Sequence, residues 1–155
     1  MNQRFIVSIL LAGISVGLAS AFFLTASERP DEGSIISEAT AGLLTATAGK
    51  VFEASCNMEL DYDAQVIDLN ADGQPEVFTQ LYGTCIGGGA GVSLDLYIKD
   101  DDGRWNSQFG FPGVYSVLES KNLGYPDISI GGPGNCFPIW RWDGKMYQLF
   151  QNCAP

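Results

Sequence analysis

The chain has 155 residues with 18 acidic side chains, 8 basic side chains and no histidine, so its formal net charge is −10. This charge repels nucleic-acid phosphates and anionic lipid surfaces, which excludes nucleic acid and favours cations or a basic protein as partners. The absence of histidine excludes Ser-His-Asp and Cys-His catalysis and the usual catalytic zinc sites.

Residues 1–26 have the features of a secretory signal peptide. Arg4 provides the positive start, an apolar run begins at Phe5, and Ala19-Ser20-Ala21 is a cleavage pattern. Residues 5–24 are also long enough to span a membrane, so an uncleaved anchor is the alternative and would be the only membrane contact. Both interpretations place the remaining chain outside the cytoplasm, in the periplasm, secreted or at the cell surface.

Residues 27–33 are polar and are predicted to form a linker, followed by a single domain over residues 34–155. Small and apolar residues recur at helical spacing from Ile35 to Leu44. This pattern predicts one helix over residues 34–48, with Ser34 as its N-cap and Gly49 at its end.

After Gly49 the chain changes to short alternating segments bounded by turn residues. These predict strands at residues 65–69, 76–82, 93–99, 104–111, 128–130, 137–142 and 145–150, with a further apolar stretch at 114–118. Asp143-Gly144 predicts a tight hairpin turn that pairs Trp142 with Lys145. The predicted fold is mainly β, a small antiparallel sandwich or partial barrel with one N-terminal helix and two disulfides.

Four cysteines, Cys56, Cys85, Cys136 and Cys153, follow the leader. An even number of cysteines in an exported chain predicts disulfides, and the absence of a C-x-x-C pair disfavours the alternative of a zinc site. Three pairings are possible; proximity in sequence favours Cys56–Cys85 and Cys136–Cys153. The predicted hairpin also brings Cys153 near Cys136.

The most specific motif is D-x-N-x-D-G-x-x-E over residues 68–76. Asp68, Asn70, Asp72 and Glu76 are predicted to contribute side-chain oxygens to a metal, and Gln74 its backbone carbonyl. Such oxygen ligands suit Ca²⁺ better than transition metals. The loop is not an EF-hand, because position 12 is Thr79 and the flanking segments are strand-like. An ordinary turn between two strands is the alternative.

Residues 66–78 resemble the calcium loop of FG-GAP/VCBS-type repeats, in which one strand enters the loop and another leaves it. The resemblance covers about a tenth of the chain and extends to Asp68, Asn70, Asp72, Gln74 and Glu76 only. Residues 124–132 and 140–147 also resemble single-module periplasmic proteins of this kind. Because the chain has one such loop, the resemblance implies a stand-alone β module rather than a propeller.

Five aromatic residues could form a sugar-binding face, although aromatic pairs in hairpins are more often core: Trp105, Tyr125, Trp140, Trp142 and Tyr147. No local pattern indicates a catalytic pair of carboxylates. We therefore predict a non-catalytic extracytoplasmic binding or structural module with a calcium loop, whose favoured partner or inhibitory target is a cationic protein. A module that binds cell-wall glycan is the alternative, and a small hydrolase is less well supported.

Overall fold

The computed structural model describes residues 30–134 and 136–153, so the predicted leader at residues 1–26 lies outside the described residues. The elements follow in the order α1 (Glu32–Ala39), β1 (Ala48–Glu53), β2 (Met58–Ile67), β3 (Glu76–Tyr82), α2 (Thr84–Gly87), the 3-10 turn η1 (Gly88–Ala90), β4 (Val92–Lys99), β5 (Trp105–Ser107), β6 (Phe111–Pro112), β7 (Val114–Asn122), β8 (Tyr125–Gly131), β9 (Ile139–Trp142) and β10 (Tyr147–Gln151). No helix within the described part of the chain is long and apolar enough to cross a membrane.

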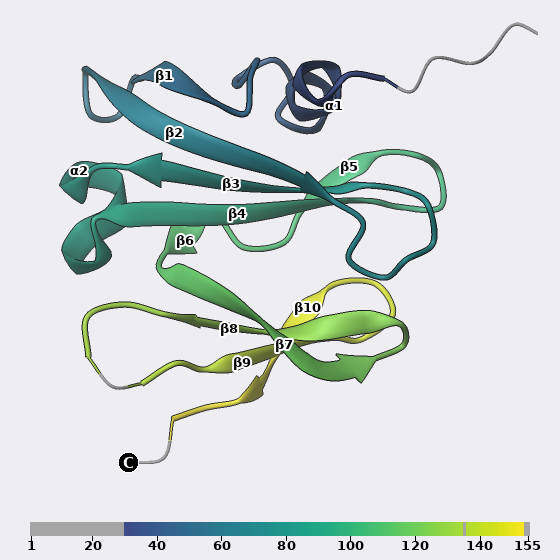
Figure 1. Cartoon of the computed structure of the whole chain (residues 1–155). Helices are drawn as coiled ribbons and strands as arrows, with labels where there is room; N and C mark the ends of the chain where they lie inside the picture. Colours follow the sequence, from purple (N-terminus) through teal and green to yellow (C-terminus); the bar gives the residue numbers. More distant parts are fainter. Residues whose placement is uncertain (1–29, 135, 154–155) are drawn as a thin grey trace, which may run out of the picture.

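The strands form two antiparallel sheets, which we call sheet A and sheet B. Sheet A has the order β1-β2-β3-β4-β5, with β6 also paired to β4, and sheet B has the order β10-β9-β8-β7. Figure 1 shows sheet A between α1 above and sheet B below. The predicted mainly-β antiparallel sandwich with one N-terminal helix is therefore confirmed.

The central strands of sheet A, β3 and β4, are covered on both faces, which explains their burial pattern. In β4, Leu94, Leu96 and Ile98 point into the core between the sheets, whereas Tyr97 packs on the side of α1. In β3, four consecutive residues, 76–79, are buried because each face meets a different layer. The alternation of residues 93–99 thus identifies a strand but not the second covered face.

Helix α1 is shorter than predicted and begins earlier. Its N-cap is Asp31, whose side chain accepts a hydrogen bond from the Ser34 N–H, so the helix includes part of the predicted linker. It ends at Ala39 because the Thr40 hydroxyl donates to the carbonyl of Ile36 and accepts from the Leu44 N–H. These two bonds turn the chain at Thr40, before the residues that were predicted to continue the helix.

The hairpin of β9 and β10 is present, but its predicted register is wrong by two residues. Trp142 pairs with Tyr147 rather than with Lys145. The Asp143 carboxylate accepts the N–H groups of both Lys145 and Met146, which stabilises a wider turn than the two-residue Asp-Gly turn.

Both predicted disulfides are confirmed. Cys56–Cys85 joins the turn between β1 and β2 to α2, with 6.1 Å between the Cα atoms. Cys136–Cys153 joins the segment before β9 to the segment after β10, with 5.6 Å between the Cα atoms. Disulfides form in oxidising compartments, which agrees with an extracytoplasmic location. The β1–β2 turn and α2, which the first of these disulfides joins, lie at the end of the sandwich opposite the β2–β3 loop (Figure 1).

Candidate functional site

The loop between β2 and β3 contains the predicted metal ligands, and three of them converge. Asp68 accepts hydrogen bonds from the N–H groups of Asp72 (3.1 Å) and Gly73 (3.0 Å). Asn70 Oδ1 accepts from the same Asp72 N–H at 3.0 Å, and Asn70 Nδ2 donates to Asp72 Oδ2 at 2.8 Å. Gly73 adopts a φ of +88° in the tight turn. Because one N–H serves two side chains, oxygens of Asp68 and Asn70 lie close together.

Glu76 closes the loop from its end but occupies a different environment. Its side chain is 2 % exposed, and its two oxygens accept hydrogen bonds from the Leu69 N–H (2.7 Å) and the Tyr125 hydroxyl (2.9 Å). Each oxygen keeps a further lone pair. Gln74 is exposed, and its N–H donates to Asp72 at 2.7 Å. The loop therefore contains three linked side chains and one buried carboxylate beside them.

The carboxylates of this loop affect the pKa of Glu76. Burial is the main cause that raises this pKa, the hydrogen bonds from Leu69 and Tyr125 oppose the rise, and the neighbouring Asp72 and Asp68 carboxylates add to it. The ion pairs of the described residues involve other carboxylates. No group of three or more Asp, Glu, Cys or His side chains within residues 30–134 and 136–153 has a ready-made metal-binding arrangement. Glu76 therefore does not form such a group with Asp68 and Asp72 in this structure.

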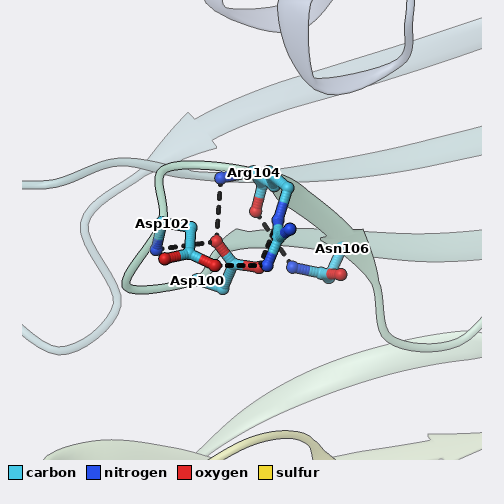
Figure 2. Close-up of polar contacts among 4 residues, drawn as sticks. All are labelled: Asp100, Asp102, Arg104 and Asn106. Carbon is cyan, nitrogen blue, oxygen red and sulfur yellow. Dashed lines mark hydrogen bonds and ion pairs between the residues drawn. The ribbon is translucent and has the colours of Figure 1, made fainter.

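A second acidic turn, between β4 and β5, lies beside this loop. Figure 2 shows Asp100 at its centre, where one carboxylate oxygen accepts the N–H groups of Asp102 and Arg104. The Arg104 guanidinium binds both Asp100 and Asp102, and the Asn106 side chain donates to the Arg104 carbonyl. The pKa of Asp100 is lowered to about 2, mainly by the hydrogen bond that its carboxylate accepts from the backbone N–H of Arg104. These carboxylates have a basic partner, unlike those of the β2–β3 loop.

The two loops and the β9–β10 turn enclose a cleft at one end of the sandwich, which we call the loop-end cleft. It comprises two adjoining cavities of about 470 and 420 Å³. Both cavities are lined by Lys99, Asp100, Asp101, Trp142 and Gly144. These turns lie at the right-hand side of Figure 1. The predicted metal loop therefore forms a wall of the cleft, through Asn70, Asp72 and Gln74.

The five aromatic residues predicted as a sugar-binding face do not form one face. Tyr125 and Tyr147 are buried in the core between the sheets, and Trp140 packs against that core. Trp105 packs on the opposite face of sheet A, beneath the Lys99 ammonium group. Trp142 alone among them lines both cavities, with its ring centroid 4.6 Å from that of Tyr125.

Two polar contacts were not predicted from the sequence. Tyr125 binds Glu76 across 49 positions of sequence. Asp127, 1 % exposed on sheet B, accepts hydrogen bonds from Arg141 (2.7 and 2.8 Å) and from the Ser120 hydroxyl (2.6 Å). No local pattern could have revealed either contact, because the partners come from different strands and are separated by seven or more residues.

Comparisons of the chain with protein-family models, with curated proteins and with solved structures found no match.

Proposed function

We propose that this chain is a non-catalytic, extracytoplasmic binding module, periplasmic or secreted, whose β2–β3 loop binds calcium. The observation that carries the proposal is the accumulation of negative charge in one loop. Asp68 and Asp72 lie beside Glu76, which is buried and lacks a basic partner in the described structure. A bound cation would compensate this charge.

The ligand set supports calcium among the available cations. Three carboxylates, the amide oxygen of Asn70 and the Gln74 carbonyl are hard oxygen donors, and a water would bring the coordination number to the six to eight that calcium takes. Two of these carboxylates and Asn70 already share hydrogen bonds within the loop. The resemblance of residues 66–78 to FG-GAP/VCBS calcium loops supports the same assignment. A nearly filled coordination shell favours a structural metal over a catalytic one, which would need open positions for substrate.

Calcium should raise the melting temperature of the protein. With a dissociation constant of about 10⁻⁴–10⁻³ M, 10 mM calcium would add roughly 1.4–2.7 kcal/mol to the free energy of unfolding. Thermal unfolding of chelator-treated protein with increasing calcium measures this gain. Asp72→Ala and Glu76→Gln should abolish the gain, because each removes a charged ligand.

Asp61→Ala provides the matched control, since Asp61 is an exposed carboxylate on β2 outside the loop. It should keep the full calcium response. The absence of any response in the wild type, or an undiminished response in both loop variants, would contradict the calcium site.

A cationic protein is the partner favoured by a second observation. At the edge of sheet A formed by β1 and β2, the strand register places Glu59, Asp61 and Asp63 on one face. Phe52, which is 59 % exposed, lies on the same face. Lys50 is the basic residue of that face. An exposed aromatic ring among carboxylates is complementary to a basic protein surface.

A pull-down from envelope extract tests this partner class. The wild type should retain a stoichiometric basic protein that is released by high salt, and Asp61→Asn/Asp63→Asn should lose it. Glu32→Gln/Glu119→Gln changes the net charge equally on other surfaces and should retain it. Equal retention by both double variants would contradict binding at this face.

A further inference from the structure

We infer that the loop-end cleft binds an uncharged oligosaccharide, with Trp142 as the stacking surface. This inference rests on the proposed calcium loop, which forms one wall of the cleft.

The shape of the cleft is the first support. Its cavities of about 470 and 420 Å³ share their central residues. Each volume is within the range of small-molecule sites, and the five residues that the cavities share join them into one site with room for more than one sugar ring. The cleft lies between three turns of two different sheets, so its walls depend on how the sheets pack.

The charge of the cleft indicates what it binds. Its lining contains three basic and four acidic side chains, so it is almost neutral in a protein of net charge −10. Arg104 is already paired with Asp100 and Asp102, and Lys99 with Glu38. Lys145 and Asp101 have no ion pair among the described residues, and the proposed calcium ion would neutralise Asp72. The lining therefore presents no cluster of charges of one sign to a strongly charged ligand, and a neutral polar ligand fits better.

The remaining lining groups match the chemistry of a sugar. The Trp142 ring packs against the rings of Tyr125 and Tyr147, and the residue is only partly buried and lines both cavities. The apolar C–H face of a pyranose ring packs on such an indole. Amide side chains both donate and accept hydrogen bonds, as sugar hydroxyls do. Four amides line the cleft: Asn70, Gln74, Asn106 and Gln108.

The calcium loop links metal binding to this site. Asn70 and Asp72 are predicted calcium ligands and also line the cleft. A metal that fixes their positions orders one wall before the sugar binds, which reduces the entropic cost of binding. Sugar affinity should therefore be higher with calcium than after its removal.

Isothermal titration of the mature protein tests the inference with four uncharged tetrasaccharides: β-1,4-linked glucose, N-acetylglucosamine, mannose and galactose. A polygalacturonate tetramer and a deacetylated chitosan tetramer serve as charged comparisons. At least one uncharged tetrasaccharide should bind with a dissociation constant below about 1 mM in 10 mM calcium. Trp142→Ala should weaken it tenfold or more, whereas Phe52→Ala, an exposed aromatic on another surface, should not.

The outcomes separate this inference from the proposed function. A protein that is stabilised by calcium but binds none of the uncharged tetrasaccharides, or only the charged ones, overturns the sugar site and leaves the calcium loop intact. Binding that Trp142→Ala leaves unchanged also overturns the inference. Sugar binding that is lost in Trp142→Ala, in a protein that calcium does not stabilise, supports the cleft and contradicts the calcium site.

Discussion

Replacing both Cys56 and Cys85 with alanine should lower the free energy of unfolding by about 3 to 4 kcal/mol. The disulfide joins residues separated by 29 positions, and this segment contains all of β2 and β3. Without the bond, the unfolded chain gains the conformational entropy that the cross-link removed. Urea denaturation of the wild type and the double variant measures the difference.

The second disulfide provides the comparison for this prediction. Cys136–Cys153 spans 17 positions, so its removal should cost about 0.5 kcal/mol less than removal of Cys56–Cys85. A loss below about 1 kcal/mol for the Cys56/Cys85 variant would show that the bond does not constrain the fold in this way.

Replacing Arg141 with methionine should lower the melting temperature by about 10 °C at pH 7. Asp127 is buried, and Arg141 makes two hydrogen bonds to it. The guanidinium also lies 3.4 Å from the ring centroid of Phe150. Methionine keeps much of the side-chain volume but leaves the Asp127 charge without its partner. Lys50→Met breaks an exposed ion pair with Asp61 and should lower the melting temperature by less than about 3 °C.

The pH dependence distinguishes loss of the charge pair from loss of packing. Hydrogen bonds from Arg141 hold the pKa of Asp127 below its ordinary value. In the wild type, this stabilisation is therefore complete above the unfolded pKa of about 3.9 and is lost as the pH falls through the lower folded pKa. Without Arg141, burial raises the pKa of Asp127. Protonation of Asp127 then removes its unpaired buried charge, so the variant is less destabilised as the pH falls.

The difference in melting temperature between Arg141→Met and the wild type should consequently shrink from pH 7 towards about pH 4. Asp127→Leu/Arg141→Met, which removes both charges, should be more stable at pH 7 than Arg141→Met alone. A difference that stays constant with pH would mean that Arg141 contributes only packing.

Features that depend on residues close together in the sequence could be predicted from the sequence. The alternation in residues 93–99 defines the two faces of β4, and both disulfide pairings follow from proximity along the chain. The errors arose where a side chain bonded to nearby backbone. Thr40 ends α1 early, and Asp143 widens the hairpin turn. In each place a local hydrogen bond outweighed a propensity of a few tenths of a kcal/mol per residue.

The β2–β3 loop shows the same division between local and long-range information. Residue spacing alone predicts that the side chains of Asp68, Asn70 and Asp72 converge, because side chains two positions apart in a tight loop converge whatever surrounds them. The environment of Glu76 depends on Tyr125 in the other sheet, 49 positions away. The motif therefore could not predict that Glu76 is buried or that its pKa is raised.

The loop-end cleft and the Asp127–Arg141 pair were decided entirely by tertiary packing. The cleft exists because sheet B packs on sheet A with the β2–β3, β4–β5 and β9–β10 turns at one end, which places Trp142 and Asp72 in the lining of one cavity. The alternation of side chains along a strand predicts which of them share a face, but it does not predict which other element covers that face. Composition, spacing and turn residues therefore defined an acidic, disulfide-bonded β-rich chain with a D-x-N-x-D-G-x-x-E loop between two strands. The stacking of its layers determined which of its polar and aromatic groups meet.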